Sequence, residues 1–369
     1  MDTILCVDIG TTSLKAALLS DKRTVEAYSR QEIFAEDKTK ISQVWLTALK
    51  NALLDMKAQN SEAAIEAICV SGNGPTLVAE SNGTTFLWNE EILSQKLNPE
   101  FNLKSTRSLY IPRLAHFKSN FESEWNGSEY IFSGPEYLIY RLTGKALTIL
   151  PEERFTDAYW TFDSLKASGF SESDAKKLPP FVKMGSFAGQ LTAKAALETG
   201  LLEGTLVFCG APDFVVALLG TGTIYPGTMC DRAGSSEGIN LCTASRVTGE
   251  GIRTLPSAIP GLWNASVLVE NSGRLKDENP EKLSLILKES LERLKNTAEN
   301  AGEVFPPFMT MTGGQCLDEK WILQKEKACG VKIRVPWCRD AELIGDLILA
   351  RVGLGDYDDF EEACFVLCR

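Results

Sequence analysis

The sequence is poor in histidine: among its 369 residues there is only one, His116. A single imidazole excludes any catalytic or metal site that needs two, and it argues against a serine or cysteine nucleophile activated by a histidine base. We therefore expect the chemistry of this protein to depend on carboxylates. His116 itself is predicted to have a packing or surface role.

Basic residues are also fewer than acidic ones. The 38 Lys and Arg residues face 49 Asp and Glu residues, which gives a net charge of −11. This sign disfavours general attraction to nucleic acids or anionic membranes. No apolar run approaches the roughly 20 residues of a membrane span, and the first ten residues lack the pattern of a secretion signal. We expect a cytoplasmic protein with no nucleic-acid or membrane partner.

Several common motifs are missing. The ten cysteines include no Cys-x-x-Cys pair, so we expect reduced and mostly buried thiols. No Gly-x-x-x-x-Gly-Lys-Ser/Thr segment is present, which excludes a P-loop nucleotidase, and no Gly-x-Gly-x-x-Gly dinucleotide fingerprint occurs. Any phosphate group must therefore be held by loops of another kind.

The first half of the chain contains a mixed α/β pattern. Apolar residues 3–9 and 14–19 flank a small hydroxylic tip, which predicts a β-hairpin. A strand at 24–33, a helix at 44–56, a strand at 65–70 and a hairpin at 76–88 follow. Antiparallel strands followed by a helix and a further strand indicate a layered α/β domain.

The second half repeats this order. A strand at 205–209, a turn at 210–213 and a helix from 214 lead into a hairpin whose arms are 227–230 and 239–243. A strand at 262–269, a helix at 280–301, a strand at 308–311, a helix at 318–328, a strand at 332–335 and a helix at 341–351 follow. A composition change at 200–204 predicts a domain boundary near residue 204, with domains 1–204 and 205–369.

The two hairpin tips are candidate phosphate loops, because backbone N–H groups near glycine can converge on phosphate oxygens while hydroxyls add donors. Asp8 ends a buried strand directly before the first tip, where an uncompensated carboxylate would be costly. It could hold Mg²⁺ beside a phosphate or accept hydrogen bonds from its own turn. Asp213 could likewise act as a base or cap the following helix.

The chain resembles the FGGY carbohydrate kinases, most closely the xylulokinase-like branch. The resemblance depends on the order and spacing of the segments 8–15, 88–90, 137–144, 189–192, 199–201, 210–213, 234–236 and 313–314, together with Trp321. It implies an α/β, two-domain actin-like ATPase (ribonuclease H-like) fold with a central cleft that binds ATP and sugar.

The resemblance also implies roles for single residues. Asp8 would help to hold Mg²⁺, and Asp213 would be the general base that accepts the proton of the attacking hydroxyl. The ATP-binding residues would be Gly10, Thr11, Thr12, Ser13, Lys15, Gly234, Ser235, Ser236, Gly313, Gly314 and Gln315. Asn73, Gly74, Trp88, Glu90 and Asp213 would contact the substrate.

The chain departs from the family pattern at several positions. Asn73 and Gly74 stand where the family has Met-His before a glycine, Glu90 replaces an Asp, and Ser235 replaces a Thr. Phe214 follows the expected base, where an amide side chain is usual. The long insert that family members carry after the strand at 262–269 is also missing.

These features leave two hypotheses. The first is an ATP- and Mg²⁺-dependent kinase of a sugar or polyol, which the retention of both Asp8 and Asp213 favours. The second is a catalytically weakened protein that binds nucleotide or sugar in a regulatory role, which the missing insert and altered sugar segment favour. Whether the chain forms a homodimer is left open.

Overall fold

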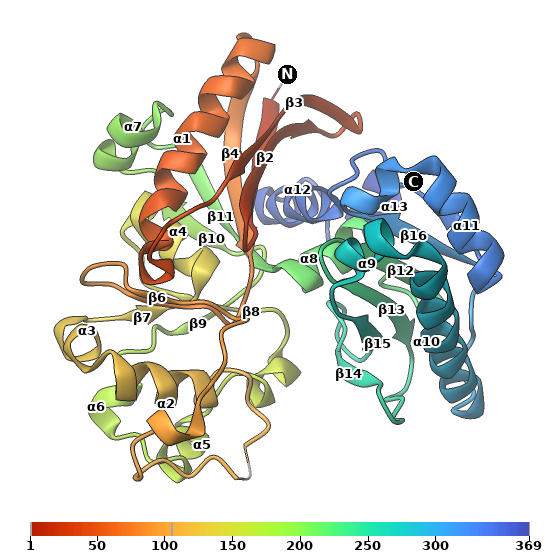
Figure 1. The fold of residues 1–369 in the computed structure, drawn as a ribbon. Helices are drawn as coiled ribbons and strands as arrows, with labels where there is room; N and C mark the ends of the chain where they lie inside the picture. Colours follow the sequence, from red (N-terminus) through yellow and green to blue (C-terminus); the bar gives the residue numbers. More distant parts are fainter. Residues whose placement is uncertain (1, 105, 369) are drawn as a thin grey trace. The chain divides into compact units, whose positions relative to one another are not determined.

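A computed structural model describes residues 2–104 and 106–368 of the protein. These residues form two compact units (Figure 1). The first comprises the chain up to Ser20 together with Val25–Asp213, and the second comprises Asp21–Thr24 and the chain from Phe214 onward. Each unit contains its own six-stranded sheet.

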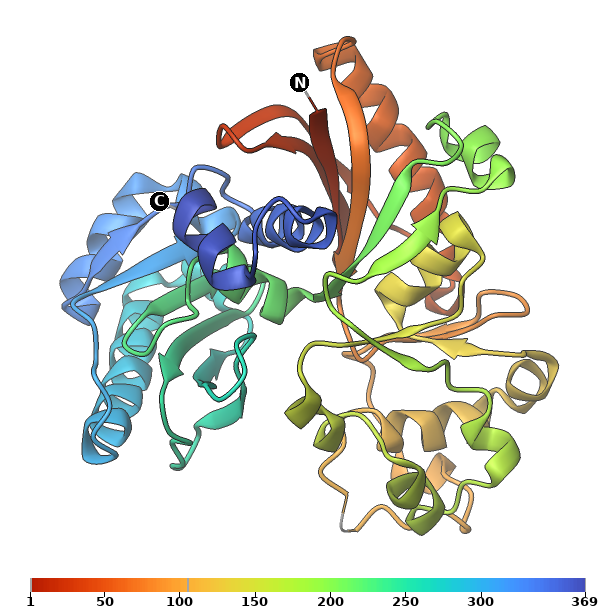
Figure 2. The same cartoon turned by 180° about the vertical axis from the view of Figure 1, so that it is seen from behind.

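The first unit is built around parallel strands with an antiparallel hairpin at one side. Its sheet has the order β10-β11-β4-β1-β2-β3, and Figure 2 shows the orange β4 between the green β11 and the red β1. β1 pairs antiparallel with β2 and parallel with β4, and β11 pairs parallel with β4. The strands are β1 (Asp2–Ile9), β2 (Ser13–Ser20), β3 (Thr24–Glu32), β4 (Ala64–Gly72), β10 (Phe187–Gln190) and β11 (Leu206–Pro212).

Helices cover this sheet. α1 (Ser42–Gln59) packs on β2, and α4 (Gly134–Thr143) packs on β4 and β11. Smaller elements complete the unit: the strands β5 (Leu77–Ala79), β6 (Thr85–Phe86), β7 (Ile131–Phe132), β8 (Thr148–Leu150) and β9 (Phe181–Lys183), and the helices α2 (Ile111–Asn120), α3 (Glu122–Gly127), α5 (Phe162–Ala167), α6 (Glu172–Ala175) and α7 (Ala193–Thr199).

Five strands of the second unit follow the same order as five strands of the first. Its sheet runs β14-β15-β13-β12-β16-β17, so that in both sheets the first hairpin lies beside two later parallel strands. The strands are β12 (Met229–Ala233), β13 (Glu237–Thr243), β14 (Arg253–Pro256), β15 (Trp263–Val269), β16 (Phe308–Thr312) and β17 (Lys332–Arg334). The predicted similarity of the two halves is therefore confirmed.

Apolar core residues alternate with polar residues along β13 and β15, so the two faces of the second sheet differ in polarity. Ile239, Leu241, Ala265 and Val267 join a core with leucines of α10, whereas the intervening polar residues face the other way. The helices of the unit are α8 (Asp213–Gly220), α9 (Ser272–Glu278), α10 (Pro280–Asn300), α11 (Glu319–Cys329), α12 (Ala341–Leu354) and α13 (Phe360–Leu367).

The turn predicted at 210–213 is wrong. β11 continues through Pro212, which pairs with Gly72, and α8 begins at Asp213. Position 210 requires glycine because β11 approaches β4 closely there: a Cβ at this position would clash with the backbone carbonyl of Val70. Tertiary pairing therefore overrides a local sequence signal that is typical of turns.

Two other predictions are confirmed. All ten cysteines are free thiols, and eight of them are buried. His116 is buried and stacks on Phe86 with a centroid distance of 4.5 Å, which is a packing role. Over the described ranges, no helix combines the length and apolar character that crossing a bilayer requires.

Candidate active site

Three of the predicted site residues lie at one edge of the first sheet. Asp8 is the penultimate residue of β1, Asn73 directly follows β4, and Asp213 directly follows β11. The strands are parallel and in register there: Ile9 and Pro212 both pair with Gly72, and the Asn73 N–H donates to the Ile9 carbonyl at 2.9 Å. The fold therefore gathers residues that are far apart in the sequence.

Asp8 is buried next to a cation. Its residue exposure is 3%, and Lys15, its cross-strand partner on β2, places Nζ 3.4 Å from Asp8 Oδ2. The adjacent tip is closed by a hydrogen bond from the Gly10 N–H to the Ser13 carbonyl at 2.9 Å. A Cβ on Gly10 would lie 2.8 Å from that carbonyl oxygen, so the turn requires glycine.

This arrangement is compatible with magnesium. In the part of the chain that the structure describes, no group of three or more His, Cys, Asp or Glu side chains could hold a metal ion. Mg²⁺ commonly needs only one or two carboxylates, with waters and substrate phosphates supplying its other ligands. A buried carboxylate beside a glycine-containing tip, such as Asp8, fits that donor set.

The predicted sugar segments connect to the first tip through hydrogen bonds. Trp88 Nε1 donates to Thr11 Oγ1 at 2.8 Å, and the Trp88 backbone N–H donates to Thr76 Oγ1 at 3.2 Å. Thr76 in turn donates to Asn73 Oδ1 at 2.6 Å. Asn73 Nδ2 is buried and has no partner among the described residues, so it can donate to a ligand.

Glu90 and Gly74 belong to the same neighbourhood. Glu90 Oε1 accepts from the Leu87 N–H at 3.3 Å, and the buried Arg113 donates to the carbonyls of Leu87 and Glu90. Burial lowers the pKa of Arg113 to about 10. A Cβ on Gly74 would lie 3.3 Å from the Tyr110 hydroxyl, so this position is tightly enclosed.

The second unit brings its two predicted nucleotide loops together. The exposed tip Gly234–Ser236 joins β12 to β13 and is closed by a hydrogen bond from the Gly234 N–H to the Ser236 carbonyl at 3.1 Å. Gln315 Nε2 donates to the Gly234 carbonyl at 3.0 Å. Gly313 has φ +93°, and a Cβ there would lie 2.6 Å from the Ala233 carbonyl oxygen.

A buried charge cluster beneath this tip was not predicted. Lys325 on α11 contacts Asp231 on β12 and Glu237 on β13, and all three side chains are fully buried. Burial, reinforced by the charge of Asp231, raises the pKa of Glu237 to about 8. The signal in the sequence was two acidic residues flanking the hairpin tip, but their partner lies almost 90 residues further on.

Sequence comparison identifies relatives of the chain. The model of the N-terminal domain of the FGGY family of carbohydrate kinases matches residues 3–220. A xylulose kinase of Staphylococcus epidermidis is 23% identical over 348 residues, which cover 84% of this chain and 68% of that protein. An autoinducer-2 kinase of Yersinia enterocolitica is 32% identical over 108 residues, 29% of this chain and 20% of that protein.

Solved structures support the predicted fold. The ligand-bound xylulose kinase of Lactobacillus acidophilus superposes with a TM-score of 0.78 at 15% identity, covering 99% of this chain and 92% of that one. Plasmodium falciparum glycerol kinase with ADP gives a TM-score of 0.76 at 12% identity, covering 100% and 93%. The prediction of an α/β, two-domain actin-like ATPase fold is therefore confirmed.

Proposed function

This chain belongs to the FGGY family of carbohydrate kinases, and we propose that it transfers the γ-phosphoryl group of ATP to a hydroxyl of a sugar or polyol in the cytoplasm. The observation that carries the proposal is the placement of Asp8, Asn73 and Asp213 at one edge of the first sheet. The family places the protein among carbohydrate kinases, whereas the roles of individual residues are our proposal.

The first tip and Asp8 would bind the phosphate end of ATP. Mg²⁺ held by Asp8 and phosphate oxygens would neutralise the charge that accumulates during phosphoryl transfer. The N–H groups and hydroxyls of residues 10–13 would donate to phosphate oxygens. Lys15, 3.4 Å from Asp8, would add a positive charge to the same region.

Asp213 would act as the general base. It begins α8 directly after the end of β11 and is half-buried, so its carboxylate is accessible to a ligand. It would accept the proton of the substrate hydroxyl as the oxygen attacks the γ-phosphorus. Transfer then needs positioning and charge neutralisation rather than a covalent enzyme intermediate.

The second unit would bind the remainder of the nucleotide. The exposed Gly234–Ser236 tip would contact phosphate, and the loop formed by Gly313, Gly314 and Gln315 would lie against adenosine. The hydrogen bond from Gln315 to the Gly234 carbonyl links the two loops, which supports the proposal that both contact the same nucleotide. Gln315 Oε1, which is buried and unpartnered within the described ranges, would accept a hydrogen bond from the ligand.

Asn73, Gly74, Trp88 and Glu90 would line the acceptor site. The free Nδ2 donor of Asn73 suits a substrate hydroxyl, and the Trp88 indole, 42% exposed, offers a flat apolar surface to a sugar ring or chain. Because a xylulose kinase of Staphylococcus epidermidis is similar to 84% of this chain, ketopentoses are the first acceptors to test.

The test is a phosphorylation assay with ATP and Mg²⁺ on a panel of ketoses, polyols and sugar acids. Asp213→Asn should lower kcat by about 10²- to 10⁴-fold, the usual contribution of a general base. ATP should still raise the Tm of this variant, because the nucleotide contacts are retained. The exposed Asp163 on α5 supplies a matched control, Asp163→Asn, which should remain active.

Two results would contradict the proposal. Undiminished turnover by Asp213→Asn would remove this residue from the role of base. A wild-type protein that binds ATP but phosphorylates no member of the panel would show binding without phosphoryl transfer.

A further inference from the structure

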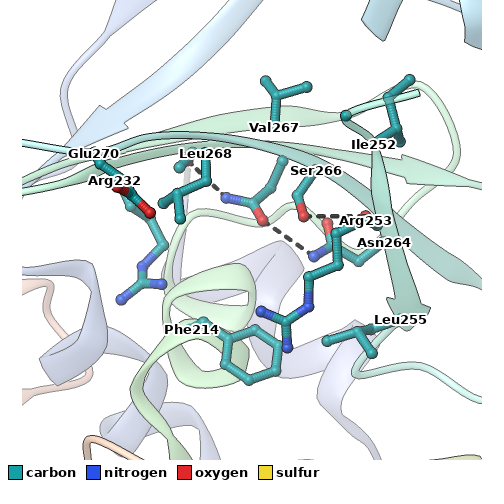
Figure 3. A pocket seen from close by; sticks show the side chains of 13 residues that line it. Phe214, Arg232, Ile252, Arg253, Leu255, Asn264, Ser266, Val267, Leu268 and Glu270 are labelled. Atoms are coloured by element: carbon teal, nitrogen blue, oxygen red, sulfur yellow. Dashed lines mark hydrogen bonds between the residues drawn. The ribbon is translucent and has the colours of Figure 1, made fainter. Parts of the chain in front are cut away.

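A pocket of about 550 Å³ lies on the polar face of the second sheet (Figure 3). The side chains that decide its chemistry are Phe214, Arg232, Asn240, Arg253, Asn264 and Glu270. They come from α8, β12, β13, β14, β15 and the residue that follows β15. The volume is within the range of small-molecule sites, and the mixture of an aromatic ring with charged and amide groups is typical of them.

The two asparagines form a hydrogen-bond relay that ends in an unused acceptor. Asn240 Nδ2 donates to the Gly238 carbonyl at 2.7 Å, and Asn264 Nδ2 donates to Asn240 Oδ1 at 3.0 Å. These bonds fix the orientation of both amides. Asn264 is only 3% exposed, and its Oδ1 has no partner in the part of the chain described here. A ligand hydroxyl would satisfy this oxygen.

Arg253 supplies an uncompensated positive charge. In Figure 3 its side chain extends toward the ring of Phe214. Across residues 2–104 and 106–368, the Arg253 guanidinium makes no ion pair or hydrogen bond. Arg253 is exposed on the wall of the pocket, and partial burial there lowers the pKa of its guanidinium from its ordinary value. The group nonetheless remains a cation at neutral pH.

The other charged groups of the pocket do not supply that missing partner. Arg232 lies 3.6 Å from Glu342, so its charge is balanced within the protein. Glu270 also lines the pocket but forms no ion pair with Arg253. A guanidinium that presents several N–H donors without a protein acceptor is suited to a carboxylate or phosphate.

We propose that this pocket binds a hydroxylated organic anion, namely a sugar or polyol that carries a carboxylate or phosphate group, at a site whose lining includes none of the proposed acceptor residues Asn73, Gly74, Trp88 and Glu90. Arg253 would pair with the anionic group, Asn264 Oδ1 would accept a hydroxyl, and the Phe214 ring would pack against the carbon chain.

The test uses three ligands with the same carbon chain: an aldonate, the alditol, and the alditol phosphate. Calorimetric titration without ATP measures their binding independently of phosphoryl transfer. The wild-type protein should bind at least one of the anions about tenfold or more tightly than the alditol, as expected for a charge-assisted pair. The anion that binds more tightly identifies the preferred group.

Arg253→Met should abolish this preference while leaving alditol binding unchanged. Lys288→Met is the matched control, since it removes one positive charge from an exposed pair with Glu292 on α10. The control should keep the wild-type preference. Equal affinities of the wild-type protein for all three ligands, or an equal loss for all three in Arg253→Met, would overturn the proposal.

Phosphorylation assays on the wider panel then separate this proposal from the proposed function. If an anion binds through Arg253 and no member of the panel is phosphorylated, the anion site stands and the proposed function fails. If members of the panel are phosphorylated and no anion binds with a preference that depends on Arg253, the anion site is refuted while the kinase function stands.

Discussion

Replacing Lys325 by methionine should strongly destabilise the second unit. Lys325 is fully buried and is the cation that contacts the buried carboxyl groups of Asp231 and Glu237. Methionine keeps most of the aliphatic volume but leaves two acidic groups without their cation. Removing one partner from a buried ion pair typically costs about 3–5 kcal/mol, a large part of the roughly 5–15 kcal/mol that stabilises a typical protein.

The cost should depend on pH. The pKa of Glu237 is raised from its ordinary 4.5 to about 8, so between these values the folded state holds a proton that the unfolded state releases. The free energy of unfolding therefore falls as pH rises through this window. Without the Lys325 charge, which opposes the rise in the pKa of Glu237, the Glu237 carboxyl group should favour its neutral form more strongly. We expect the destabilisation of Lys325→Met to be largest near pH 8 and smaller near pH 5.

Urea unfolding at pH 5 and pH 8, combined with hydrogen exchange of the β12 and β13 amides, measures this effect. Lys332→Met is the control, because its 3.2 Å pair with Glu326 is on the surface and should contribute less than about 1 kcal/mol. Adding Glu237→Gln to Lys325→Met should recover part of the loss. An unfolding free energy of Lys325→Met within about 1 kcal/mol of wild type at pH 8 would show that the buried ion cluster does not stabilise the second unit.

Three further predictions concern the site and its supports. Gly345→Ala places a Cβ against the Val216 carbonyl of α8. This overpacking should lower the free energy of unfolding by about 1–3 kcal/mol, and it should lower kcat because α8 begins at Asp213. An unchanged Tm would contradict the prediction. Trp88→Phe removes the donor to Thr11; KM for the acceptor should rise several-fold with little change in Tm, and an unaltered KM would argue against the acceptor site. Burial raises the pKa of Glu136 from its ordinary 4.5 to about 7. As pH rises between these values, the contribution of Glu136 to the free energy of unfolding should decrease by up to about 1.4 kcal/mol per pH unit. Urea midpoints should therefore fall less steeply from pH 5 to 8 for Glu136→Gln than for the wild type, and identical slopes would refute this assignment.

Local patterns in the sequence were sufficient for much of the architecture. Short apolar segments on either side of glycine-containing tips predicted both hairpins, and helical periodicity predicted α1 and α10. Such patterns are visible because each reflects which faces of a single element are buried. The resemblance to the FGGY kinases then identified Asp8 and Asp213 as candidates, although they are about 200 residues apart.

Other features could be recognised only in the folded chain. Residues 106–180 form short helices and contribute the short strands β7 and β8, whose partners lie outside this range, so no local period marks them. That Arg253 has no ion-pair partner among the described residues is a property of its surroundings, and nothing in the segment Arg253–Pro256 signals it.

The residue types of the site can be read from the chain alone: carboxylates, hydroxyls and glycines at strand ends, with a single histidine. Which of these residues meet depends on the fold. Pairing between strands joined the end of β11 to β4, and packing of α11 on the sheet brought Lys325 to two acidic groups. The physical reason is that hydrogen bonding between strands and burial of charge depend on neighbours in space, and these are set only when the whole chain has folded.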